Sequence, residues 1–128
     1  MTILGIDYGT AKVGLAIASG AVATPLRVVR YADRKELRQE LYRAIQEYDI
    51  REIVVGMPKN DRSCTKEVVE WMRREFSLPV LVEDEQLTTA FAKRLMRGWK
   101  GKAEDDAIAA TLILQSHIER EGKKRQGS

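Results

Sequence analysis

The sequence has very few of the side chains on which many enzyme classes depend. Among its 128 residues there is one cysteine, Cys64, and one histidine, His117. A single thiol excludes an internal disulfide, and one cysteine with one histidine excludes a zinc site built from these ligands. A nuclease that needs two histidines is excluded as well. Cys64 lies near an expected helix start, but no histidine is close in sequence, so an inert thiol is favoured.

Other signatures are also missing. No Gly-x-Ser-x-Gly sequence supplies a serine nucleophile, and no Gly-x-x-x-x-Gly-Lys-Ser/Thr loop supplies a nucleoside triphosphate site. No apolar run is long enough to span a bilayer, and the chain opens directly into an expected strand without a leader. We therefore expect a cytoplasmic protein without a membrane partner. The net charge of +3 is a mild hint of a polyanionic partner.

Hydrophobic periodicity predicts an α/β chain. The expected strands lie at 2–8, 12–19, 25–31, 53–56 and 79–82. Helices are expected over 34–48 and 65–76, from Thr88 to about 98, and from about 103 to Gly122. Asp33 and Glu36 have the spacing of a capping box at the start of the first helix. Residues 123–128 are expected to form a basic flexible tail.

The order of these elements predicts one domain over residues 1–122. Three consecutive strands form a meander, and two later strands, each preceded by a helix, add in parallel through right-handed crossovers. The fold class is therefore α/β, with a five-stranded mixed sheet flanked by helices. In such sheets, ligand sites form at the carboxyl ends of the parallel strands.

Acidic residues recur at the boundaries of these elements. Asp7 ends the first strand, Asp84 and Glu85 follow the last, and Asp105 and Asp106 open the final helix. Carboxylates from separate elements could hold hard divalent cations, and two such ions can activate water toward a phosphodiester. Each acid also has a simpler interpretation: a turn residue at Asp7, solvation of a strand end, or a favourable charge at a helix N-terminus.

A basic run follows the last predicted strand. It contains no acid, and its members are Lys93, Arg94, Arg97, Lys100 and Lys102. Such a run could hold the backbone of a nucleic acid, although a solvated helix face is the alternative. Thr10 and Thr88 could add hydrogen bonds to phosphate, with helix capping as the alternative for Thr88.

Four stretches together resemble the YqgF/RuvX family, whose members are described as candidate Holliday junction resolvases or candidate nucleases of the 16S ribosomal RNA precursor. The stretches are Leu4–Thr10, Ile53–Pro58, Asp84–Thr89 and Asp106–Gln115. Their order and spacing make the resemblance specific over nearly the whole chain. It implies an RNase H-like fold and a nuclease that processes the 5′ end of pre-16S rRNA in ribosome biogenesis or resolves Holliday junctions.

The resemblance also implies the site. Asp7, Glu85 and Asp106 match the catalytic and metal-binding acids of the family, with Asp105 as the alternative third ligand, and the expected cofactor is Mg²⁺ or Mn²⁺. Two departures bear on phosphate binding. Gln86 stands where the family usually has arginine, and Lys59 replaces a residue that is usually apolar, so Lys59 could restore a positive charge.

Two other functions stay open at this level. A module of the same fold could bind RNA or the ribosome without catalysis. The Asp7–Thr10 stretch also resembles the phosphate loop of actin-like kinases and ATPases, but those proteins surround their nucleotide with two such domains. The sequence does not separate structured RNA from branched DNA, endonuclease from exonuclease, or monomer from homodimer.

Overall fold

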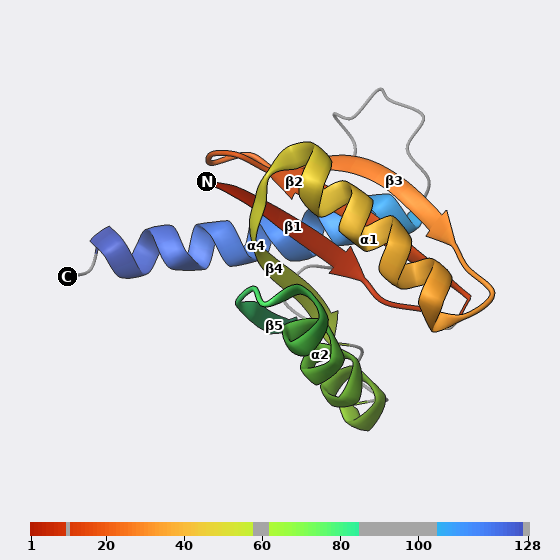
Figure 1. The fold of residues 1–128 in the computed structure, drawn as a ribbon. Coiled ribbons are helices and arrows are strands. Elements are labelled where there is room, and N and C mark those ends of the chain that lie inside the picture. The colour runs from red at the N-terminus through yellow and green to blue at the C-terminus, as the bar shows by residue number, and fades with distance from the viewer. Residues whose placement is uncertain (10, 58–61, 85–104, 127–128) are drawn as a thin grey trace.

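Five strands form one sheet in the computed structural model, which describes residues 1–9, 11–57, 62–84 and 105–126 (Figure 1). The strands are β1 (Thr2–Asp7), β2 (Lys12–Ala18), β3 (Thr24–Arg30), β4 (Ile50–Met57) and β5 (Val80–Asp84). The helices are α1 (Arg34–Tyr48), α2 (Arg62–Phe76) and α4 (Asp105–Gln126). None of the helices in these residues is long and apolar enough to cross a membrane.

The strand order is β3-β2-β1-β4-β5, so the first strand lies at the centre of the sheet. β1 pairs antiparallel with β2 and parallel with β4; β2–β3 is antiparallel and β4–β5 parallel. A meander extended by two parallel strands is the predicted fold class, which is confirmed. Pro25 lies in β3 at the sheet edge, where a residue that cannot donate to the ladder is tolerated.

Helix α1 has the predicted bounds and the predicted cap. The Asp33 carboxylate accepts a hydrogen bond from the amide of Glu36 at 2.9 Å. The return bond comes from the amide of Ala32, one residue before the cap, to Glu36 Oε2 at 3.0 Å. The first bond satisfies an amide that the first helical turn leaves without a partner, and the second fixes the chain that enters the helix. At the other end, Asp49 takes the left-handed conformation with φ 52°.

Three predicted boundaries are wrong by three residues or more. β4 begins at Ile50 rather than 53, because pairing with β1 carries the strand past polar residues that an apolar pattern excludes. α2 begins at Arg62 rather than 65. α4 continues through Gly122 to Gln126, since one glycine costs a helix only about 1 kcal/mol among good helix formers. The helix expected from Thr88 lies outside the described residues.

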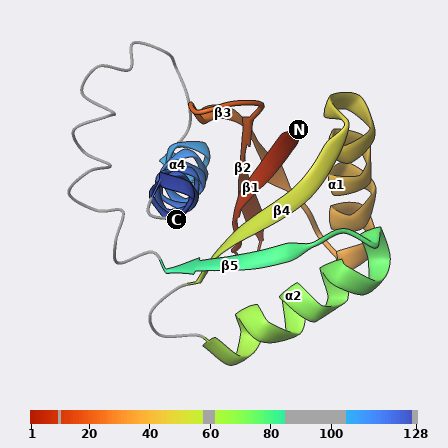
Figure 2. The ribbon, with the colours of Figure 1, turned by 90° about the vertical axis from the view of Figure 1, so that its left-hand side faces the viewer.

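Among the described helices, α1 and α2 cover one face of the sheet and α4 covers the other (Figure 2). On the first face, Leu4 and Ile6 of β1 pack in one buried cluster with residues of α1 and α2 such as Leu41 and Met72. The second face is built largely from small residues, which lets α4 approach closely. A Cβ atom added to Gly5 would lie 2.8 Å from Leu114 Cβ and 3.0 Å from the carbonyl oxygen of Ala110.

Candidate functional site

Asp7 is the last residue of the central strand, and both of its lateral neighbours are glycines. It is paired with Gly14 of β2 and with Gly56 of β4. Directly opposed residues of paired strands point to the same face. Alternation along β1 puts Asp7 on the same face as Gly5, which contacts α4. The half-buried carboxylate is therefore flanked on both sides by residues without side chains, which leaves room beside it for a ligand.

A cavity of about 620 Å³ opens at this edge of the sheet. Its lining comes from the end of β1, the β1–β2 turn, the end of β3 and the start of α1: Asp7, Tyr8, Gly9, Ala11, Lys12, Arg30, Tyr31, Ala32 and Glu36. Tyr31 joins the turn to β3, because its hydroxyl donates to the carbonyl oxygen of Gly9 at 2.5 Å and its amide donates to that of Ala11 at 3.1 Å. Gly9 is required in the turn, since a Cβ there would lie 2.6 Å from the carbonyl oxygen of Lys12.

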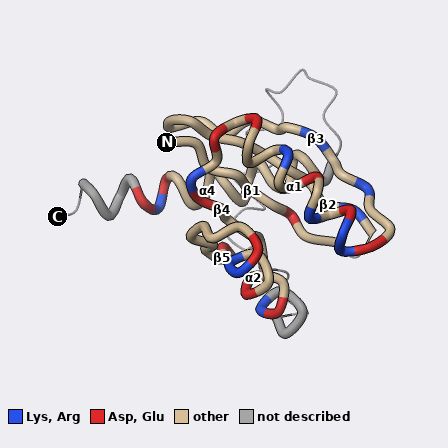
Figure 3. The backbone as a smooth tube through the Cα atoms, viewed as in Figure 1, with Lys and Arg blue, Asp and Glu red and all other residues tan. Residues whose placement is uncertain are grey.

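Charges of both signs gather at this end of the sheet, near the labels β2 and α1 in Figure 3. Lys12 and Arg30 are exposed and line the cavity together with the acids Asp7 and Glu36. A site of mixed charge suits a phosphate group with its metal ion, because basic side chains attract the phosphate and carboxylates attract the metal ion.

An arginine beside the cavity ties α1 to α2. The Arg34 guanidinium donates two hydrogen bonds to the Glu67 carboxylate, at 2.6 and 3.2 Å, and its central carbon lies 4.8 Å from the centre of the Trp71 ring. The hydrogen bond from Arg34 holds the pKa of Glu67 below its ordinary value of 4.5, and the same bond raises the pKa of Arg34. Arg34 also interacts with Tyr8 of the cavity lining.

Of the predicted site residues, the structure describes the side chain of Asp7. The backbones of Asp105 and Asp106 begin α4, as predicted, and their side chains lie outside the described residues. The remaining predicted site residues also lie outside: Thr10, Lys59, Glu85, Thr88, Lys93, Arg94, Arg97, Lys100 and Lys102. Within the described part of the chain, no three acids, histidines or cysteines converge on a point that could hold a metal ion. Asp7 itself, a hard oxygen donor between two glycines, fits a hard divalent cation.

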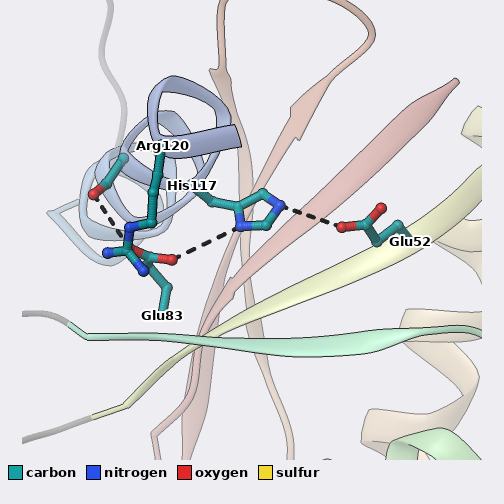
Figure 4. Close-up of polar contacts among 5 residues, drawn as sticks. Glu52, Glu83, His117 and Arg120 are labelled. Atoms are coloured by element: carbon teal, nitrogen blue, oxygen red, sulfur yellow. Dashed lines mark hydrogen bonds and ion pairs between the residues drawn. The ribbon is translucent and has the colours of Figure 1, made fainter. Parts of the chain in front are cut away.

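A buried ionic network on the α4 face was not expected from the sequence (Figure 4). Glu83 of β5 is 1% exposed and forms an ion pair with Arg120 of α4. His117 lies between two carboxylates, with Nε2 3.3 Å from Glu52 Oε1 and Nδ1 3.8 Å from Glu83 Oε2. Ser116 Oγ lies 3.4 Å from the Glu83 carboxylate. Glu83 lies just beyond the strand that the sequence predicts over 79–82, but β5 includes it and the network buries it.

One sequence signal could have indicated this network. His117 continues the helical spacing of Ala110 and Leu114, which face the sheet. Its side chain is therefore expected to contact a strand. Alternation along β5 gives Glu83 the opposite face from Val82 and so directs it toward α4. The network ties the end of β5, which Glu85 follows in the sequence, to α4, which has Asp106 in its first turn.

Comparisons with known proteins place nearly the whole chain in one family. Residues 1–120 match the family described as RuvX, Holliday junction resolvase. A candidate pre-16S rRNA nuclease of Koribacter versatilis is 36% identical over 97% of this chain and 90% of its own length. A protein of the same description from Thermoanaerobacter pseudethanolicus is 32% identical over 97% of this chain and 100% of its own length.

Solved structures show the same fold. The RuvC structure of Thermus thermophilus in complex with a Holliday junction substrate covers 95% of this chain and 96% of its own, with a TM-score of 0.65 at 16% identity. The fowlpox virus resolvase in complex with a Holliday junction covers 94% of this chain and 99% of its own, with a TM-score of 0.63 at 13% identity. Both are resolvases of RNase H-like fold, so the predicted fold is confirmed.

Proposed function

The chain belongs to the RuvX family of Holliday junction resolvases, and from this premise we propose that it is a metal-dependent nuclease that hydrolyses phosphodiester bonds. The observation that carries the proposal is the position of Asp7, at the carboxyl end of the central strand, between two glycines and on the wall of a cavity. Relatives described as candidate pre-16S rRNA nucleases favour the 5′ end of that RNA as substrate, with Holliday junction DNA as the alternative.

Asp7, Glu85 and Asp106 would hold Mg²⁺ or Mn²⁺, with Asp105 as the alternative third ligand. A bound ion of this kind supplies activation of water and neutralisation of charge on the phosphate. The carboxylates orient it, and the cavity provides the space for the substrate. This chemistry needs oxygen ligands from separate elements at one point, and the single histidine of the chain excludes the alternative of a two-histidine nuclease.

The packing of α4 supports the inclusion of Asp106. Gly5 contacts Ala110 and Leu114, and β1 and α4 run in opposite directions (Figure 1). Asp7 lies two residues beyond Gly5, about 7 Å along the strand. Asp106 lies four residues before Ala110, about 6 Å along the helix. The first turn of α4 is therefore expected over the end of β1, on the face that Asp7 occupies.

The test is a cleavage panel with Mg²⁺ over four substrates: precursor 16S rRNA, a four-way DNA junction, duplex DNA and single-stranded DNA. The parent is expected to cut at least one of them, and Asp7→Asn to lose at least 100-fold in rate, on the order of the effect of one catalytic group. Asp49→Asn is the matched control, because its carboxylate is 80% exposed at the far end of α1 and its loss is expected to change nothing.

Equal cleavage by Asp7→Asn and the parent would refute the site assignment. A chain that cuts none of the substrates, but binds RNA equally well after Glu85→Gln and with the metal removed, would instead be the non-catalytic RNA-binding or ribosome-binding module. Cleavage by the parent that EDTA leaves intact would refute the metal dependence while leaving the nuclease activity in place.

A further inference from the structure

We propose that Lys12 and Arg30 form a phosphate-binding subsite that holds the nucleic-acid backbone beside Asp7. Both residues line the cavity at the sheet edge, and both are exposed. The inference rests on the proposed function and extends it, because it adds two described residues to a contact surface that the sequence analysis located in the 93–102 run. It also gives the direction in which the substrate leaves the cleavage centre.

The register of the sheet puts the two cations together. Lys12 opens β2 and Arg30 ends β3, and the two residues are directly opposed in the antiparallel pair. The next opposed pair, Val13 and Val29, is buried in the cluster that faces α1 and α2. Because side chains alternate along a strand, Lys12 and Arg30 project on the other face, which is also the face of Asp7.

The same register gives their distance from the acid. Adjacent strands are about 4.8 Å apart, so Lys12 lies about one strand spacing and Arg30 about two spacings to the side of β1. Both also lie two residues, about 7 Å, beyond the level of Gly14, the residue of β2 that pairs with Asp7. All three residues are at the edge where β1 ends. A backbone whose scissile phosphate lies at Asp7 would therefore reach the two cations if it crossed β2 toward β3.

The charge arrangement favours an anion at this place. Like charges directly opposed in an antiparallel pair repel each other, and a phosphate between them converts the repulsion into two attractions. Arginine offers its planar group to two phosphate oxygens, and lysine adds a point charge. Lys12 and Arg30 each already interact with another group of the protein. A bound phosphate would therefore replace that group as their partner.

The experiment measures binding as a function of salt. A labelled RNA that spans the 5′ end of the 16S precursor and a labelled four-way DNA junction are titrated with protein in EDTA, so that cleavage does not interfere. Each lost phosphate contact reduces the slope of log K against log salt by about 0.9 on duplex and about 0.7 on single strands. The double variant Lys12→Gln/Arg30→Gln is therefore expected to lose about 1.4–1.8 from the slope of the parent.

The control variant is Arg43→Gln/Lys66→Gln, which removes the same charge from exposed positions on α1 and α2 that do not line the cavity. Its slope is expected to stay close to that of the parent. Arg30→Lys keeps the charge and is expected to keep the slope but weaken binding. Melting curves establish that all variants are folded, as expected for substitutions at exposed positions.

The outcomes separate the two proposals. A parent that binds, with equal slopes for the cavity variant and the control variant, overturns the subsite and leaves the nuclease assignment intact. A reduced slope in the cavity variant alone supports the subsite, even where Asp7→Asn still cuts and the catalytic assignment fails. A parent that neither binds nor cuts any of the substrates overturns the proposed function and the subsite together.

Discussion

Glu83, at the end of β5, is paired with Arg120 in the C-terminal half of α4 (Figure 4). The glutamate is 1% exposed, whereas the arginine side chain is 42% exposed and keeps part of its hydration. The buried carboxylate is thus neutralised by a guanidinium that lies at the surface, and His117 is its second neighbour. It links the sheet edge to the helix that covers it.

Loss of the charge at Glu83 is expected to destabilise the fold. Glu83→Gln keeps the shape but removes the charge from the hydrogen bonds that Arg120 and Ser116 make with it, which are worth about 1.5–3 kcal/mol when charged. We expect the free energy of unfolding in urea to fall by about 1–3 kcal/mol. The control is Glu75→Gln, whose partly exposed pair with Arg38 is worth at most about 1 kcal/mol. Equal losses in the two variants would refute the special role of Glu83.

The contact between Gly5 and α4 predicts a steric effect at the centre of the sheet. Gly5→Ala puts a Cβ 2.8 Å from Leu114 Cβ and 3.0 Å from a backbone oxygen, so helix and strand must separate. Such overpacking costs about 1–3 kcal/mol. We expect a matching fall in unfolding free energy and, because the start of α4 moves relative to Asp7, slower cleavage. Gly20→Ala, with no atom within 4 Å of the added Cβ, is expected to change neither quantity.

The Gln115 side chain holds the connection between β2 and β3 through two hydrogen bonds to its backbone. Its side-chain oxygen accepts from the amide of Ala23 at 2.8 Å, and its nitrogen donates to the carbonyl oxygen of Ala21 at 3.0 Å. Gln115→Leu leaves both backbone groups without this partner, which costs about 1–3 kcal/mol for each buried group left unpaired. We expect faster hydrogen exchange at the Ala23 amide and a lower melting temperature. An unchanged exchange rate there would contradict the anchor.

The Arg34–Glu67 pair predicts a small loss of stability in acid. The folded-state pKa of Glu67 is lowered, chiefly by the hydrogen bond from Arg34. Its contribution is therefore present above pH 4.5 and is lost as the pH falls through the folded-state value. Because the Glu67 side chain is 58% exposed, the contribution is below about 1 kcal/mol.

Titration of the Glu67 carboxyl by NMR tests this pair directly. In Arg34→Gln the pKa of Glu67 is expected to rise toward 4.5, because the variant removes the main cause of its shift. Arg43→Gln, at an exposed position of the same helix, is the control and is expected to leave the titration of Glu67 as it is in the parent. A shift in both variants would point to overall charge rather than to the hydrogen bond.

Local features of the chain were sufficient to predict most of its elements. The capping pair Asp33 and Glu36 located the start of α1, and apolar runs located all five strands. These signals succeed because caps and periodicity act between residues close in sequence. They fail at boundaries such as Ile50 and Gly122, where strand pairing and helix continuation override the local pattern.

The candidate site divides in the same way. The sequence singled out Asp7 as an acid at the end of an apolar strand, and the resemblance added Glu85 and Asp106 as its partners. Neither predicted that Gly14 and Gly56 flank Asp7, because strand register depends on pairing between distant segments. Lys12 and Arg30 likewise become neighbours only through the register of β2 and β3.

Burial of charge was decided by the tertiary structure alone. Glu83 and Asp84 look alike as two acids that end an apolar strand, and the packing of α4 turns Glu83 into an interior ion-pair partner of Arg120 that also lies beside His117. Composition and periodicity describe which face a residue takes, and they established an α/β chain with an acid at its central strand. The docking of α4 on the sheet decides which of these side chains meet, because the contacts join residues that lie far apart along the chain.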